Sequence, residues 1–370
     1  YSTGADAVVM SSRSMGNGAD GMYFTGALPQ VVADTCMANY NGMNFANGVL
    51  PAAFTDNYCS GNTYAQYFVP VRDVDAVWID NACGLGGSIG IRPGSLGGSA
   101  EWLDDYIYMV YGDITVPHDM SLTLEPGVLM KFTADDNLTV NGQLIAEGTM
   151  GDEIVFTSLK DDEYGGDTNL DGLSNGVPGD WHYLMFDGTN PGCTMQYCIV
   201  RFAGQMHGAS NYYRNAVIVN GTGAELTMTD CEIEETSGGS LYPYAVVVYA
   251  GSDFQMSNCH VHDNHGTGVR IFEPTAQITG CLAENHPVYG FYVHPELVGE
   301  IATDDSLSAN GYGNCLAIAG GNITADDSWP RTYTSLRHDN VTRDPGATVV
   351  IEKGSVVKFQ PGDYRLEVQG

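Results

Sequence analysis

The sequence predicts an all-β protein, built as a parallel β-solenoid with little helix. Short runs rich in Val, Ile, Thr, Tyr and Phe are separated by Gly, Asn and Asp, which is typical of short strands joined by tight turns. Sustained apolar periodicity of the helical kind is almost absent. A strand-turn phrase also recurs roughly every 20 to 30 residues, a spacing typical of stacked structural repeats.

That phrase is clearest in "LTMTDCEI" (226–233), "FQMSNCHV" (254–261) and "AQITGCLA" (276–283). Each copy has apolar residues alternating with polar ones, then two polar or small residues and a cysteine. One turn of a solenoid cannot bury its inward face alone, so stacked turns must build a continuous apolar column. A β-sandwich would also supply short strands, but it would not repeat one phrase at this rung-like spacing.

The sequence also contains a longer repeat, which spans many of these strand-turn phrases. The segment "SLTLEPGVLMKFTADDNLTVNG" (121–142) returns in altered form as "ATVVIEKGSVVKFQPGDYRLEVQG" (347–370). We therefore predict the last rungs of one β-helix module in 1–104, and a complete module in 105–331 with a loop insertion at 160–181. The start of a third copy is predicted in 332–370. Since the chain begins and ends inside a module, we expect its ends to be covered by further covalent repeats or by copies of itself stacked end to end.

The segments "DITVPHDMSLTLEPGVLMKF", "LTVNGQLIAEGT", "GDW" and "MQYCIVRFAG" carry a family resemblance. They resemble the right-handed parallel β-helix repeat proteins of bacterial and archaeal surfaces, in the pectate-lyase-like superfamily. The resemblance covers most of the chain and implies a right-handed parallel β-helix. It leaves function open, because this fold hosts lyases, hydrolases, adhesins and passive stalks.

The charge balance narrows the classes of partner. Asp and Glu number 45 against 14 Lys and Arg, so the formal net charge is -31. Such a surface repels nucleic acid and anionic lipid, and no apolar run is long enough to span a membrane. An acidic surface suits solubility outside cells and suits hard cations such as Ca²⁺. We expect a secreted, extracellular or cell-surface protein.

The strongest site signal is the loop "DDEYGGDTNLDGLSNGVPGDW" (161–181). Asp167, Asn169 and Asp171, followed by Gly172, have the oxygen spacing and the turn glycine of a calcium loop. The loop also resembles calcium-binding repeats of the thrombospondin type. Pro178 stands where an EF-hand has its bidentate glutamate, so further ligands must come from elsewhere, and the nearest candidates are Asp161, Asp162 and Asp180. We predict a structural Ca²⁺ here, with an ordinary acidic loop as the alternative.

Cysteines and histidines also recur at defined positions of the repeated phrase. The rung cysteines are predicted to form an inward ladder of small side chains that stay reduced: Cys36, Cys59, Cys231, Cys259 and Cys281. In "CHVHDNHG", strand alternation places His260 and His262 on one outward face, where a metal site is conceivable. The matching stretch of the first copy, "CMANYNGM", has no histidine, which favours surface variation.

No catalytic set is predicted. The paired aspartates lie in turn-like contexts, where solvated aspartates are typical: Asp161-Asp162, Asp304-Asp305 and Asp326-Asp327. The sequence therefore favours a structural extracellular repeat protein, part of a filament, stalk or surface layer. The alternatives are a polysaccharide-active enzyme, either lyase or hydrolase, and an adhesin that binds cell-surface polysaccharide through outward tyrosines: Tyr212, Tyr213, Tyr242 and Tyr244.

Overall fold

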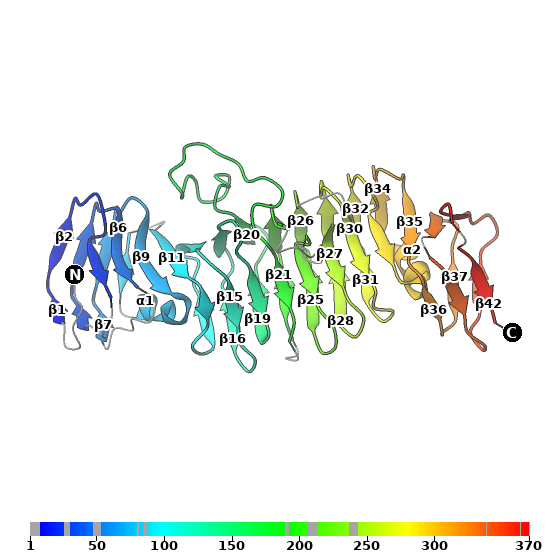
Figure 1. The fold of residues 1–370 in the computed structure, drawn as a ribbon, viewed down its shortest axis with the longest axis horizontal. Coiled ribbons are helices and arrows are strands. Elements are labelled where there is room, and N and C mark those ends of the chain that lie inside the picture. The colour runs from blue at the N-terminus through cyan, green and yellow to red at the C-terminus, as the bar shows by residue number, and fades with distance from the viewer. Residues whose placement is uncertain are drawn as a thin grey trace. The chain divides into compact units, whose positions relative to one another are not determined.

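The computed structural model describes residues 8–25, 30–46, 53–79, 81–84, 87–188, 192–205, 214–236, 243–337, 339–362 and 364–369. The chain divides into two compact units, Tyr1–Gly176 and Val177–Gly370, and each is considered by itself. Both are stacks of short parallel strands, with about 14 turns in all (Figure 1). The predicted all-β parallel solenoid is confirmed.

Strands of the first unit pair in parallel ladders, each strand hydrogen-bonding to the equivalent strand one turn away. One ladder contains β1 (Val8–Met10), β4 (Gln30–Val32) and β7 (Ala53–Thr55), and a second contains β2 (Arg13–Met15), β5 (Thr35–Met37), β8 (Tyr58–Ser60) and β10 (Ala82–Cys83). A third contains β3 (Met22–Phe24), β6 (Asn41–Phe45), β9 (Ala65–Pro70), β11 (Gly87–Arg92), β14 (Tyr106–Val110), β17 (Leu129–Phe132) and β20 (Ile154–Ser158). The last two contain β12 (Gly94–Ser95), β15 (Ile114–Val116) and β18 (Leu138–Val140), and β13 (Ala100–Trp102), β16 (Ser121–Leu124) and β19 (Gln143–Glu147).

The second unit repeats this plan. One ladder contains β23 (Cys198–Arg201), β26 (Glu232–Glu234), β29 (His260–His262), β32 (Leu282–Glu284) and β34 (Ser306–Ser308). Another contains β21 (Leu184–Phe186), β24 (Val217–Val219), β27 (Tyr244–Val248), β30 (Thr267–Ile271), β33 (Phe291–Val293), β35 (Cys315–Ile318), β38 (Thr334–Arg337) and β41 (Val357–Phe359). The others contain β22 (Thr194–Gln196), β25 (Glu225–Thr229), β28 (Asp253–Ser257) and β31 (Gln277–Thr279); β36 (Gly321–Ile323), β39 (Val341–Arg343) and β42 (Leu366–Val368); and β37 (Asp327–Trp329) and β40 (Val349–Ile351).

Helix is scarce, as the sequence predicts. Within the described residues, the α-helices are α1 (Asp75–Ile79) and α2 (Val298–Asp304). Each follows a short 3₁₀ turn, η1 (Val71–Asp73) or η3 (Pro295–Leu297).

Single residues in the left-handed conformation turn the chain from one ladder to the next. The residue before Cys231, Cys259 and Cys281 has a positive φ in each case: 53° at Asp230, 54° at Asn258 and 69° at Gly280. Asn, Asp and Gly adopt this conformation at the lowest cost. The "D-C", "N-C" and "G-C" pairs of the repeated phrase therefore mark corners of the solenoid.

Inward side chains stack in register along the column. Ile233, Val261 and Ala283 occupy equivalent positions on three successive strands, and each is fully buried. The cysteines follow the same rule. Cys231, Cys259 and Cys281 are buried at the preceding corners, and all nine cysteines of the chain are free. The predicted inward position of the rung cysteines is confirmed.

Cys36 and Cys59 form another buried stack in the first unit, within strands and not at corners. They are aligned in β5 and β8, and Cys83 of β10 extends the row. Burial raises the pKa of Cys83 to about 11 and raises that of Cys59 well above its usual value, so these thiols are held in the protonated form.

A buried polar ladder satisfies the backbone at another corner of the second unit. The backbone N–H of His286 donates to Oδ1 of Asn310 at 3.1 Å, as that of Thr236 does to Asn264 at 2.9 Å. The side chains of the ladder donate in turn to carbonyl oxygens of the preceding rung: Asn264 to Ile233, His286 to Val261 and Asn310 to Ala283. His286 thus takes a place that asparagine holds on either side.

Candidate metal centre

The predicted calcium loop begins shortly after β20 of the first unit. Asp161 is fully buried, and its Oδ2 accepts a 2.6 Å hydrogen bond from Oγ1 of Thr157. Its Oδ1 accepts from the backbone N–H of Glu163 at 3.2 Å. This carboxylate therefore fixes the first residues of the loop to the last strand before it.

Three of the six predicted ligand residues come together. One carboxylate oxygen from each of Asp162, Asp167 and Asp171 lies within 4.8 Å of the others. Asp167 accepts from the backbone N–H groups of Asp171 and Gly172, both at 3.1 Å, so the chain wraps around its carboxylate. Gly172 has a φ of 88°, which a residue with a side chain rarely adopts.

The other predicted ligands have different positions. Asn169 flanks the cluster, and its Nδ2 donates to Oδ2 of Asp171 at 2.8 Å. Asp180 lies in the second unit, where its carboxylate accepts from the backbone N–H of Val177 at 2.8 Å. Oδ1 of Asp162 is buried and has no hydrogen-bond partner among the described residues. A buried anionic oxygen of this kind is costly unless a cation lies against it.

A cationic side chain that the sequence analysis missed reaches this loop. Lys131 of β17 is fully buried, and its Nζ donates to the carbonyl oxygen of Gly166 at 2.8 Å and to Oγ1 of Thr168 at 3.1 Å. Burial lowers the pKa of Lys131 to about 8, although the neighbouring aspartates oppose this shift. Its counterpart in the repeat, Lys358, is exposed. The one available signal is a lysine inside the apolar run "VLMKF".

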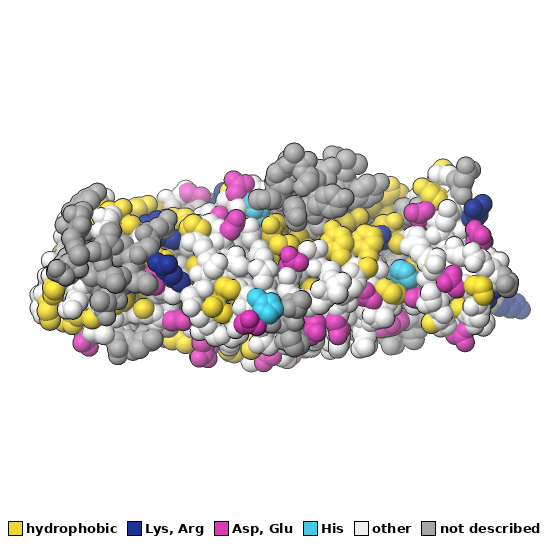
Figure 2. Space-filling model, turned by 60° about the horizontal axis from the view of Figure 1, so that its bottom comes forward, with side chains coloured by type: hydrophobic (Ala, Val, Ile, Leu, Met, Phe, Trp, Pro, Cys, Tyr) yellow, Lys and Arg dark blue, Asp and Glu magenta, His cyan; other side chains and the backbone are white. Residues whose placement is uncertain are grey.

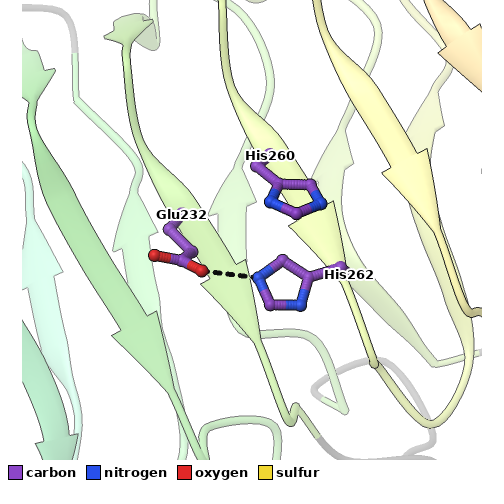
Figure 3. A group of neighbouring side chains, drawn as sticks. All are labelled: Glu232, His260 and His262. Atoms are coloured by element: carbon purple, nitrogen blue, oxygen red, sulfur yellow. Dashed lines mark hydrogen bonds and ion pairs between the residues drawn. The ribbon is translucent and has the colours of Figure 1, made fainter.

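A second cluster contains nitrogen as well as oxygen donors. Glu232 of β26 lies beside His260 and His262 of β29, and the three offer ligand atoms within 4.8 Å of one another (Figure 3). Burial disfavours the charged ring of His262, but hydrogen bonds to Glu232 and Asp263 raise its pKa to about 9. The predicted outward placement of both histidines is confirmed. Glu232 was missed, although it follows Cys231 as His260 follows Cys259.

The described aspartates of the other pairs hold the backbone. Oδ1 of Asp305 accepts from the N–H of Cys281 at 2.6 Å. Oδ1 of Asp327 accepts from the backbone N–H of Ser328 at 2.7 Å, and Oδ1 of Asp326 accepts from the backbone N–H of Thr348 at 2.6 Å. The side chain of Asp304 lies outside the described residues.

Of the tyrosines named for carbohydrate binding, only one can be located. Tyr212, Tyr213 and Tyr242 lie outside the described residues. Tyr244 is half-buried, and it packs against a cluster formed by Ile218 and its neighbours.

Comparison with known proteins bears on the fold. Residues 186–329 match a family model described as a right handed beta helix region. No curated protein and no solved structure matches the chain. The match, together with the parallel stacking of the strands, supports a right-handed parallel β-helix repeat protein.

Proposed function

We propose that this protein is a structural element of an extracellular filament, stalk or surface layer. The observation that carries the proposal is the stack of about 14 turns, in which equivalent parallel strands repeat along the chain. Ile351 of β40 is aligned with Trp329 of β37, yet Ile351 is 43% exposed whereas Trp329 is fully buried. The apolar position that Trp329 buries in β37 is thus exposed in β40.

Edge strands add hydrogen-bonding capacity to these surfaces. β1 and β42 are each the outermost strand of their ladder, and parallel edge strands present unpaired N–H and C=O groups. Apolar side chains on these strands are exposed, including Met10 at 57% and Val368 at 65%. Such a surface fits another solenoid turn, supplied by a longer chain or by a second copy stacked end to end.

Surface charge supports an extracellular setting. The formal charge of -31 keeps an acidic protein soluble, and Figure 2 shows Asp and Glu side chains scattered over the visible face. Within the described part of the chain, no helix has the length and apolar character to cross a membrane.

The test is self-association of the 370-residue chain, measured by sedimentation velocity over a range of concentrations. We expect end-to-end oligomers, and we expect Met10→Lys and Val368→Lys to weaken them by placing charge on the edge strands. Leu173→Lys is the matched control, because Leu173 is 99% exposed and lies in the acidic loop and not on an edge strand. A monodisperse monomer at all concentrations, together with a native intact mass equal to this chain, would overturn the proposal. Binding to a glycan array or cleavage of a polysaccharide would instead favour the adhesin or the enzyme.

We also propose that Ca²⁺ binds among Asp162, Asp167 and Asp171 and stabilises the loop. Three carboxylates within 4.8 Å repel one another, and hard dications prefer such oxygen donors. Asn169, backbone carbonyls and water would complete the shell. The role is structural, since it holds a long loop in place against Lys131 and β20.

Calcium binding should appear as added stability. At a hundredfold excess over Kd the expected gain is about 2.7 kcal/mol in the free energy of unfolding. Thermal unfolding with calcium and with chelator measures it. Asp171→Ala should abolish the difference, whereas Asp119→Ala, at an exposed aspartate paired with His118, should keep it. An unchanged midpoint on adding chelator to the wild type would contradict the assignment.

A further inference from the structure

We propose that Glu232, His260 and His262 form a binding site for a borderline divalent transition-metal ion such as Zn²⁺, distinct from the calcium loop. The site lies on the outward face of the β26–β29 pair in the second unit. Ile233 and Val261, between the outward positions, point into the column and are fully buried. Parallel pairing then fixes Glu232 opposite His260, and Glu234 opposite His262.

Stacking of the strands sets the distances. Neighbouring strands lie about 4.8 Å apart, so outward side chains at adjacent or diagonal positions fall within reach of a shared ion. Nε2 of His262 lies 2.6 Å from Oε1 of Glu232, and the ring centroids of His260 and His262 are 4.0 Å apart. Tetrahedral ligands at about 2.0–2.1 Å from zinc lie about 3.3 Å from one another. The 2.6 Å contact is shorter than this value and the two rings stack at 30°, so the side chains must rotate apart to admit an ion.

Each histidine also has a carboxylate on its other ring nitrogen. Nδ1 of His262 lies 2.8 Å from Oδ2 of Asp263, and Nε2 of His260 lies 3.0 Å from Oε1 of Glu284. In Figure 3 one ring nitrogen of His260 lies on the side of Glu232, and the ring stacks over that of His262. A carboxylate that accepts from the distal N–H fixes the tautomer and orients the ring, an arrangement found at most histidine–metal sites.

Charge and exposure favour a cation from solvent. Glu234 neighbours the site and pairs with Arg201 at 3.2 Å, whereas Glu232, Asp263 and Glu284 place three carboxylates around the two histidines. The side chains of His260 and Glu232 are 38% and 41% exposed, so an ion can enter. Two imidazoles and one carboxylate suit Zn²⁺, Cu²⁺ or Ni²⁺ better than Ca²⁺, and three protein ligands leave a position for water.

The experiment is isothermal titration of the metal-free 370-residue protein with Zn²⁺ at neutral pH, in excess Ca²⁺ so that the acidic loop is occupied. We expect one high-affinity equivalent that His260→Ala and Glu232→Gln each weaken at least tenfold. Asp263→Asn should weaken it by about 10–100-fold, because it removes only the orienting carboxylate. Replacing Zn²⁺ with Co²⁺ should give tetrahedral d–d absorption in the wild type and lose it in His260→Ala.

The matched control is His118→Ala. His118 pairs with Asp119 at 2.9 Å on an exposed surface. The substitution therefore removes a histidine–carboxylate pair outside the cluster, and it should leave the Zn²⁺ affinity unchanged. Far-UV circular dichroism of each metal-free variant confirms that it is folded. The proposal is overturned if the wild type binds no Zn²⁺ below millimolar concentration, or if folded His260→Ala and Glu232→Gln bind as tightly as the wild type. In either case the cluster is a set of histidine–carboxylate ion pairs.

Discussion

Replacing His286 with asparagine should make the second unit less sensitive to acid. His286 is 1% exposed and its ring sits in the polar ladder between Asn264 and Asn310. Burial lowers its pKa from 6.5 to about 4, although the carbonyl oxygen of Val261 partly opposes this shift. The ring is therefore neutral in the folded protein at neutral pH, and it donates through Nε2 like the amides on either side.

The sign and size of the effect follow from proton linkage. The unfolded chain takes up a proton on this histidine at a higher pH than the folded chain does, so acid favours unfolding. The contribution of His286 is fully present above about pH 6.5 and is lost as the pH falls towards its folded pKa of about 4. At about pH 5 the loss amounts to about 2 kcal/mol.

Urea denaturation followed by far-UV circular dichroism, in chelator, measures this loss. His286→Asn keeps a side-chain donor and acceptor in the ladder but leaves a small cavity. The cavity should lower the stability of the variant by the same amount at every pH. The informative quantity is the wild-type minus variant difference as a function of pH. The nearest charged groups, His262 and Asp263, are present in both proteins and largely cancel. A difference that stays constant from neutral pH to about pH 5, or that grows in favour of the wild type, refutes the reasoning.

Three further predictions concern the column and the loop. Lys131→Met should destabilise the loop by about 3 kcal/mol in chelator, because the substitution leaves the neighbouring carboxylates uncompensated, and it should increase the stabilisation by Ca²⁺. Thermal unfolding with and without Ca²⁺ measures both effects. An unchanged unfolding midpoint of the variant in chelator would contradict this prediction. Cys231, Cys259 and Cys281 should all be alkylated after denaturation without reductant, as mass spectrometry would show, whereas a linked Cys259–Cys281 peptide would disprove the reduced ladder. Gly142→Ala should destabilise the first unit by several kcal/mol in urea denaturation, because its Cβ would collide with two carbonyl oxygens at the preceding corner; wild-type stability would show that the corner can relax.

Much of the fold could be predicted because each turn of the solenoid is specified by residues that are close together in the sequence. Each rung needs an alternating strand, a residue that tolerates positive φ and a small inward residue, and these stand side by side in "TDCEI", "SNCHV" and "TGCLA". The repeated spacing then fixes which strands stack. The proximity of the carboxylates in the acidic loop could also be predicted, since Asp167 and Asp171 lie four residues apart and Gly172 follows.

Other features depended on register and on side-chain reach, which no local pattern encodes. Glu232 lies 28 residues before His260, and only the pairing of β26 with β29 makes them neighbours. Lys131 meets Gly166 because its buried side chain extends from β17 to the loop, 35 residues away in sequence. The sequence by itself determined a stacked parallel β-fold with an acidic insertion. The tertiary structure decided which charges meet, because contacts between turns depend on strand register and on the path of the loop, not on neighbouring residues.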